Sequence, residues 1–317
     1  MRREIRFGSR ESELAVAQTI LVMKAIARSR PELPLRLITM KTRGDLHPEL
    51  PLEDAAEGWF TGKSLFTGAL EKALVREEID VCVHSLKDMA VDEDALLPIV
   101  GMAKRGDPRD MLILPRQTGK TDSPFSELCF YKPLPVEWSH IQPIGCSSMR
   151  RRIQLLARMP NLTVAAIRGN VPTRLDKLDA GQYGALILAA AGIERLGVKN
   201  RPGFFFAVRD MVPAAGQGVL ALQGRRGEDY SFLDALRDPV TEKAAQTERR
   251  VMQALGGGCH FPAAAYAKIS GAEMTIIALY AAAIDTPVFI EEISGESDRA
   301  LEMAERLARL LLSKAEG

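Results

Sequence analysis

Six arginines of this 317-residue sequence stand where predicted strands pass into loops and helices. They are Arg10, Arg150, Arg151, Arg168, Arg174 and Arg195. A guanidinium binds a carboxylate through two parallel hydrogen bonds, and a helix N-terminus adds amide donors and a favourable dipole. The carboxyl ends of strands are also where open α/β sheets hold ligands. The pattern predicts capture of a molecule with several carboxylates; the alternative for each arginine is a solvated helix face or a salt bridge.

Two further side chains could act chemically beside such arginines. Asp88 follows the apolar run 79–83 after a short turn, where a carboxylate can serve as general acid and base and stabilise a developing cation. Its alternative role is an Asx-turn or a helix cap. Cys259 follows the glycines 256–258, which would let a bulky group approach the backbone. The alternative for Cys259 is a buried, unreactive thiol.

Composition narrows the classes of protein to consider. Lysine plus arginine number 42 and aspartate plus glutamate 41, so no overall charge attracts nucleic acid or an anionic membrane. The N-terminus lacks the apolar run of a signal peptide, and no apolar stretch approaches the roughly 20 residues of a membrane span. The cysteines are far apart and the histidines do not have zinc-ligand spacing, which predicts reduced thiols and no metal site. We expect a cytoplasmic protein without nucleic-acid or membrane partners.

Two glycine-rich segments resemble nucleotide-binding motifs but do not fit them. Segment 58–64 has one residue fewer between its glycines than a phosphate-binding P-loop requires. Segment 216–221 imitates a dinucleotide fingerprint, yet Pro213 interrupts the strand that should precede it, and 219–222 is typical of a strand where a helix should begin. We therefore reject nucleotide binding at both.

The arginines and Asp88 need an α/β framework to position them. Strand 5–7, loop 8–11 and a helix capped by Ser12 open the first unit, and the near-continuous apolar run 79–83 suits a buried parallel strand. The helix capped by Ser12 is expected to carry its apolar face on Leu14, Ala17, Ile20, Leu21 and Met23. Further strands are predicted at 35–40, 97–102, 144, 163–167 and 185–188, and further helices at 65–76, 148–158 and 172–179. Two α/β lobes fit this order better than one long sheet.

A third, smaller domain is predicted after a linker at 224–227. It contains a helix at 241–255 ended by glycines, strands at 274–280 and 287–293, and an amphipathic helix at 298–314. Segment 119–142, rich in Pro, Ser and aromatic residues, is interpreted as an irregular surface excursion. The predicted division is a first lobe of 1–104 with 209–226, a second lobe of 105–208, and a C-terminal domain of 227–317.

Assembled in order, these segments resemble the porphobilinogen deaminase (hydroxymethylbilane synthase) family through most of the chain. The matching runs are GSRES at 8–12, GKSLF at 62–66, DVCVHSLKD at 80–88, SSMRR at 147–151, RGNVPTR at 168–174, GQG at 216–218, and GGC at 257–259 with Pro262. Any one run alone would be weak, whereas their joint occurrence and spacing are specific.

The resemblance implies a monomeric three-domain transferase whose first two lobes are similar to type II periplasmic binding proteins, with the active site between them. It implies Asp88 as the catalytic acid and base, and a dipyrromethane cofactor held by a thioether to Cys259. The implied cofactor contacts are Lys63, Lys87, Ser148, Arg150, Arg151 and Arg174, and the implied substrate contacts are Arg10, Ser12, Arg168 and Arg195. The implied reaction joins porphobilinogen units, with loss of ammonia, into the linear tetrapyrrole hydroxymethylbilane in porphyrin and heme biosynthesis.

The sequence also departs from the pattern that this family usually shows. Gly68-Ala69 stand in place of Lys-Glu, Ala90 in place of a proline, and Leu222-Gln223 in place of Ile-Glu, and segment 119–142 is longer than the family's connection. One substrate-facing lysine is therefore missing. Two alternatives stay open: a two-lobed binding or regulatory protein without catalysis, and a divergent relative that loads the cofactor but turns over poorly.

Overall fold

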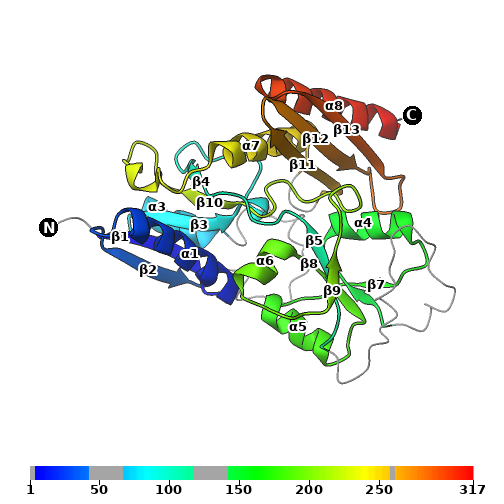
Figure 1. Cartoon of the computed structure of the whole chain (residues 1–317), viewed down its shortest axis with the longest axis horizontal. Coiled ribbons are helices and arrows are strands. Elements are labelled where there is room, and N and C mark those ends of the chain that lie inside the picture. Colours follow the sequence, from blue (N-terminus) through cyan, green and yellow to red (C-terminus); the bar gives the residue numbers. More distant parts are fainter. Residues whose placement is uncertain (1–3, 43–66, 117–141, 258–260, 317) are drawn as a thin grey trace. The chain divides into compact units, whose positions relative to one another are not determined.

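The computed structural model describes residues 4–42, 67–116, 142–257 and 261–316, which form two compact units. Unit 1 comprises Met1–Gly106 and Gly218–Gln246, and unit 2 comprises Asp107–Gln217 and Thr247–Gly317. Figure 1 shows both units and labels most of their helices and strands. Within these described ranges, no helix combines the length and apolar character needed to cross a membrane.

Unit 1 is built on a five-stranded mixed sheet with the strand order β2-β1-β3-β10-β4. The strands are β1 (Ile5–Arg10), β2 (Leu35–Met40), β3 (Val81–Ser85), β4 (Ile99–Met102) and β10 (Leu220–Gln223), and the helices are α1 (Glu13–Ser29) and α3 (Gly68–Val75). Strand β1 is parallel to β2 and β3, whereas β10 is antiparallel to β3 and β4. The carboxyl ends of β1 and β3 therefore open on the same edge of the sheet.

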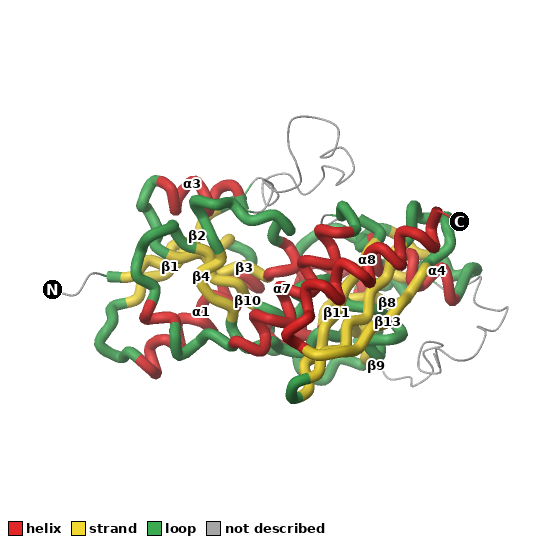
Figure 2. Tube along the Cα trace, turned by 90° about the horizontal axis from the view of Figure 1, so that it is seen from above, coloured by secondary structure: helices red, strands yellow, loops and turns green. Residues whose placement is uncertain are grey.

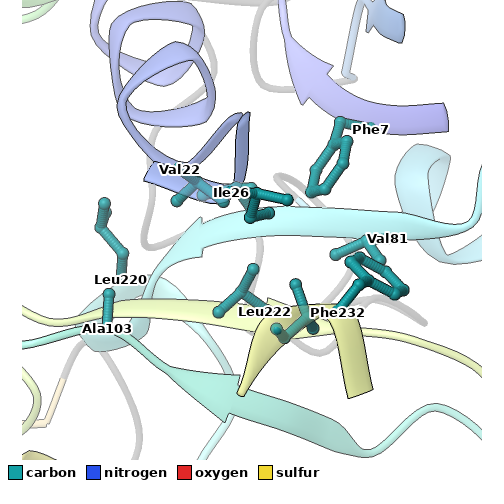
Figure 3. Packing of buried hydrophobic residues seen from close by; sticks show 10 residues of the cluster. Phe7, Val22, Ile26, Val81, Ala103, Leu220, Leu222 and Phe232 are labelled. Atoms are coloured by element: carbon teal, nitrogen blue, oxygen red, sulfur yellow. The ribbon is translucent and has the colours of Figure 1, made fainter. Parts of the chain in front are cut away.

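The central strand β3 is buried on both faces because each face packs against a different helix. Val81 joins Val22 and Ile26 of α1 in one apolar cluster, which Figure 3 shows. The next residue, Cys82, points to the opposite face and joins Leu70 of α3 in a second cluster. This two-sided burial confirms the buried parallel strand that the apolar run predicts.

Strand boundaries in unit 1 differ from the predicted ones. The prediction of a loop from Gly8 is wrong, because β1 continues to Arg10 and pairs with β2 as far as Met40. Strand β3 begins and ends two residues later than predicted, at Val81–Ser85. This shift brings the end of β3 directly to the turn that carries Asp88.

Helix α1 begins after Ser12 as predicted, but it buries a different face. Ile20 and Leu21, two of the predicted apolar positions, are 37% and 46% exposed, while Gln18 and Thr19 are buried. Burial of these polar side chains is tolerated because each is hydrogen-bonded. Gln18 donates to a serine hydroxyl at the end of β3 (3.0 Å), and the Thr19 hydroxyl donates to a carbonyl one turn earlier (3.0 Å).

Unit 2 contains a second five-stranded mixed sheet, with the strand order β7-β6-β8-β5-β9. The strands are β5 (Asp110–Ile113), β6 (Ile144–Gly145), β7 (Val164–Ala165), β8 (Ala185–Ala189) and β9 (Gly203–Phe205), and the helices are α4 (Met149–Arg158), α5 (Val171–Asp179) and α6 (Ala190–Arg195). Strand β6 is parallel to its neighbours β7 and β8, and β5 is antiparallel to β8 and β9. Two α/β sheets of this kind confirm the predicted fold class.

Successive residues of β8 divide the core of this sheet in two. Ile187 packs with Leu155 of α4 in one apolar cluster, and Leu186 packs with Leu175 of α5 in the other. The sheet is therefore covered on both faces, as in unit 1.

The C-terminal part of unit 2 is a three-stranded antiparallel sheet of β11 (Ala263–Ser270), β12 (Glu273–Tyr280) and β13 (Phe289–Glu296). Helix α8 (Ala300–Glu316) lies along it (Figures 1 and 2). Ile277 and Leu279 of β12 pack against Ile153 of α4 and Val212. The preceding helix α7 (Pro239–Ala254) is followed by Gly256 in the left-handed conformation (φ 71°), which confirms the predicted glycine stop. The boundary of this domain at residue 227 stays a prediction.

Candidate functional site

Asp88 lies at the edge of the unit 1 sheet onto which β1 and β3 open. It ends a short 3₁₀ turn, η2 (Leu86–Asp88), that directly follows β3, and Arg10 is the last residue of the neighbouring parallel strand β1. Asp88 is exposed, and Arg10 and Lys87 are half-buried. The structure therefore brings a carboxylate and two cationic side chains, Asp88, Lys87 and Arg10, to one sheet edge, as the sequence predicts for Asp88 and Arg10.

Two buried apolar side chains hold this turn in place. Leu86 and Met89 are 1% and 7% exposed and pack in one cluster with Val219. The Leu86 amide donates to the Val219 carbonyl (3.0 Å), and the Met89 amide donates to the Leu86 carbonyl (3.0 Å). Because the anchors flank Lys87 and Asp88, the polar pair is presented at the edge on a fixed backbone.

A buried histidine, His84, lies in β3 two residues before this turn begins. His84 Nε2 is 3.1 Å from Gln223 Oε1, and the Gln223 amide nitrogen donates to the Leu97 carbonyl (3.0 Å). Since a carbonyl only accepts, the Gln223 amide has one orientation, and His84 must donate from Nε2. Burial, with a smaller contribution from the positive charge of Arg10, lowers the pKa of His84 to about 4. His84 is therefore neutral, and its tautomer is fixed.

Ser12 takes the capping role that its sequence context predicts. It is the N-cap of α1, and its hydroxyl accepts a hydrogen bond from the Ala15 amide (3.4 Å). The cap places Ser12 two residues beyond Arg10, at the same end of β1. Its role as a substrate contact stays a prediction.

In unit 2, three adjacent parallel strands lead into the segments that carry the other predicted arginines. Strand β6 leads to α4, whose first turn holds Arg150 and Arg151. Strand β7 leads to Arg168 and then to α5 with Arg174, and β8 leads to α6, which ends at Arg195. The strand order β7-β6-β8 makes these three segments neighbours. This confirms the predicted placement after strands, although Arg195 lies at the far end of its helix.

Arg150 and Arg151 are almost fully buried and share one carboxylate. An Nη2 of Arg150 lies 2.8 Å from Asp110 Oδ2, and Nη2 of Arg151 lies 2.7 Å from Asp110 Oδ1. Asp110, the first residue of β5, is 0% exposed. The predicted alternative of a salt bridge therefore holds for these two arginines, and their role as cofactor contacts stays a prediction. Asp110 was not predicted from the sequence, since nothing in its neighbourhood marks it as the partner of residues 40 and 41 positions away.

The loop before α5 is shaped by two cationic side chains. Nε of Arg174 donates to the Gly169 carbonyl (2.8 Å), and Nζ of Lys177 donates to the Arg168 carbonyl (3.0 Å). Gly169 has φ 113°, which a residue with a side chain rarely adopts, and a Cβ at this position would lie only 2.8 Å from the Thr173 side chain. The half-buried Arg168 is thus presented from a fixed loop. At the neighbouring segment, burial lowers the pKa of Arg195.

Of the remaining predicted site residues, the structure describes Ser148 but not Lys63 or Cys259. Ser148 occupies the N-cap position of α4 and is half-buried. Lys63, Cys259 and nearly all of segment 119–142 lie outside the described residues.

Cys82 and Cys146 are free and buried, and burial raises the pKa of both thiols, as expected for unreactive core cysteines. Within the described ranges, no cluster of three or more His, Cys, Asp or Glu residues could hold a metal ion.

Comparison with protein families identifies two consecutive matching regions. Residues 5–232 match the model described as "Porphobilinogen deaminase, dipyromethane cofactor binding domain", and residues 243–313 match "Porphobilinogen deaminase, C-terminal domain". Among solved structures, the BenM effector binding domain with its effector benzoate aligns with a TM-score of 0.43 and 13% identity over 74% of this chain and 89% of that one. A likeness this weak carries no argument about fold or ligand.

Curated relatives give the same result over nearly the whole chain. The porphobilinogen deaminase of Ruminiclostridium josui is 40% identical over 311 residues, covering 98% of each chain. That of Alkaliphilus oremlandii is 41% identical over 305 residues, covering 96% of this chain and 95% of its own. The chain therefore belongs to the porphobilinogen deaminase family.

Proposed function

We propose that this protein is a porphobilinogen deaminase, a transferase that joins porphobilinogen units with loss of ammonia into hydroxymethylbilane. The observation that supports this most is the exposed Asp88 at the end of β3, on the same sheet edge as Arg10 and Lys87. We further propose that it works in the cytoplasm as a monomer with porphobilinogen as its small-molecule partner.

Asp88 can perform the proton transfers that this condensation requires. It delivers a proton to the leaving amine of porphobilinogen, stabilises the pyrrole cation that forms, and removes a proton when the new carbon–carbon bond is complete. Its exposure at the sheet edge gives substrate and water access to the carboxyl group. Arg10 and Lys87 lie beside it, where they can bind the acetate and propionate groups of the substrate.

The described residues also fit a dipyrromethane cofactor. That cofactor carries carboxylates like those of the substrate, and the unit 2 sheet ends in segments that carry Arg150, Arg151, Arg168 and Arg174. The α4 N-terminus adds backbone amide donors at the same sheet edge. Bound dipyrromethane would supply the pyrrole carbon at which chain growth begins. These arginines with Ser148, Lys63 and Lys87 would hold it, and Cys259 would attach it.

Intact-protein mass spectrometry tests the cofactor part of this proposal. The wild-type protein should exceed its polypeptide mass by one dipyrromethane group, and Cys259→Ser should lack the excess. Cys82→Ala is the matched control, because Cys82 is a buried thiol of the unit 1 core and should leave the added mass unchanged. An active protein with no added mass would refute attachment of a cofactor to Cys259.

A further inference from the structure

The ion cluster of Asp110, Arg150 and Arg151 in unit 2 is almost fully buried. The side chains of Arg150, Arg151 and Asp110 are 6%, 9% and 0% exposed. Besides Asp110, Arg150 donates to the Val212 carbonyl (2.6 Å) and Arg151 to the Ile187 carbonyl (3.0 Å). Each guanidinium is therefore fixed by a carboxylate oxygen and a backbone oxygen.

The position of these arginines in α4 is electrostatically unfavourable without Asp110. They lie in the first turn, at the positive end of the helix dipole, where acidic residues are normally favoured. The first turn of α4 contains no acidic residue, and Arg152 adds a third cation there. Asp110 supplies a carboxylate from another element, β5, and the three buried side chains together still carry one net positive charge.

Gln217 also binds the carboxylate of Asp110, at the oxygen that Arg151 contacts. Its amide nitrogen donates to Asp110 Oδ1 (2.9 Å) and to the Pro108 carbonyl (2.7 Å). Both acceptors are oxygens, so the amide orientation is determined, and its oxygen faces Arg150 Nη2 at 3.5 Å. The motif Gly216-Gln217-Gly218, rejected above as a dinucleotide fingerprint, thus supplies a side chain that orients Asp110.

The loop that carries Gln217 is itself held at two points. Gln154 of α4 accepts from the Val212 amide (2.7 Å) and donates to the Val212 carbonyl (3.2 Å). The Gly216 amide donates to the buried Glu248 (2.7 Å), which also accepts from the Ala267 amide of β11 (2.8 Å). The loop therefore connects α4 to the C-terminal sheet and gives the ion cluster a rigid surrounding.

We propose that Asp110 is a positioning residue that orients Arg150 and Arg151 toward the carboxylates of the dipyrromethane cofactor and the growing pyrrole chain. This inference rests on the proposed function. Asp110 fixes the direction of both guanidiniums and offsets one of their two charges, which lets the pair stay buried while an excess positive charge remains for an anionic ligand.

The test compares Asp110→Asn, Asp110→Glu and wild-type protein after incubation with porphobilinogen. Asp110→Asn keeps the shape of the side chain and removes its charge, so we expect a smaller fraction of cofactor-loaded protein by intact mass. In the loaded fraction we expect KM for porphobilinogen to rise about tenfold, the effect of misplacing one charge-assisted contact, with kcat changed less. Asp110→Glu retains the charge and should restore much of the loading.

Asp179→Asn is the matched control for loss of an ion pair in the same unit. Asp179 binds Arg201 through two contacts of 2.5 and 2.7 Å at the end of α5, away from α4. This variant should lose stability but keep the wild-type loading and KM. The same outcome for Asp110→Asn would reduce Asp110 to a structural role and overturn the inference. Equal losses in folded Asp110→Asn and Asp110→Glu would also overturn it, because the charge would then not matter.

The wild-type arm separates this inference from the proposed function. If wild-type protein acquires no added mass and consumes no porphobilinogen, the proposed function fails and the inference with it. If the wild type is loaded and active and Asp110→Asn equals it, only the inference fails.

Discussion

The two sheet edges of this protein hold their charged residues in opposite ways. At the unit 1 edge, Asp88 is exposed, and apolar anchors on either side fix only its backbone. At the unit 2 edge, Arg150 and Arg151 are buried and fixed through their charged groups by Asp110. A group that exchanges protons needs access to substrate and water, whereas groups that orient a large anionic chain benefit from being pre-organised. The comparison predicts that changes at the first edge affect turnover and changes at the second affect binding and stability.

The largest expected effect is the loss of turnover in Asp88→Asn. Removing a general acid and base should lower kcat by about 10²- to 10⁴-fold, with little effect on the free energy of unfolding because the side chain is exposed. Ammonia release from porphobilinogen measures this, and Asp285→Asn, an exposed aspartate of unit 2, is the control. Near-normal turnover would remove Asp88 from the chemistry.

A large stability effect is expected at the second edge. Arg151→Ala removes one partner of a buried ion cluster and should destabilise the protein by about 3 kcal/mol, the lower end for such a loss because Arg150 still contacts Asp110. Its neighbour Arg152 is exposed, so Arg152→Ala should change stability by less than about 0.5 kcal/mol. Urea unfolding of the two variants provides the comparison. Equal midpoints would show that burial of Arg151 carries no energetic weight.

A smaller, pH-dependent effect is expected from His84. Its pKa is about 4 in the folded protein and near its usual value of 6.5 when unfolded, so protonation favours the unfolded state. The contribution of His84 to the free energy of unfolding is fully present above pH 6.5. It falls by up to about 3 kcal/mol as the pH is lowered from 6.5 toward 4. His84→Gln should flatten this part of the unfolding profile. An unchanged slope in that variant would assign the acid sensitivity to other groups.

The Gln223→Glu variant tests the contact between Gln223 and His84, because it restores the acid that the family usually has. A carboxylate next to the imidazole should raise the pKa of His84 and allow it to carry a charge near neutral pH. Nitrogen chemical shifts of the imidazole report this change. A His84 that stays neutral above pH 5 in Gln223→Glu would contradict the contact between the two side chains.

Patterns that lie within one element were predictable from the sequence. The N-cap at Ser12, the glycine stop after α7 and the helices after β6 and β7 follow from local signals, and the structure has each of them. The strand β11 was missed because its sequence AAAYAKIS is rich in alanine, which is depleted in strands. Its place depends on full pairing with β12, a long-range contact that its composition does not indicate.

Side-chain partnerships across elements were not predictable from the sequence. The buried Gln18 lies on a face of α1 that looks polar in the sequence, and only its hydrogen bond to the end of β3 makes the burial favourable. The arginines 150 and 151 have the residue type and spacing of ligand contacts, yet their partner Asp110 follows a proline-arginine segment without any functional mark. The sequence motifs therefore located the candidate site, whereas only the structure showed which charged residues of the site pair with one another.

Release of ammonia during the joining of pyrrole units is the reaction that most directly tests the proposed function. Wild-type protein should be incubated with porphobilinogen, and the ammonia, the remaining substrate and the linear tetrapyrrole should be quantified together. We predict equal amounts of ammonia formed and porphobilinogen consumed, with hydroxymethylbilane as the product. Binding of porphobilinogen without ammonia or tetrapyrrole would contradict the account and identify the chain as a binding protein.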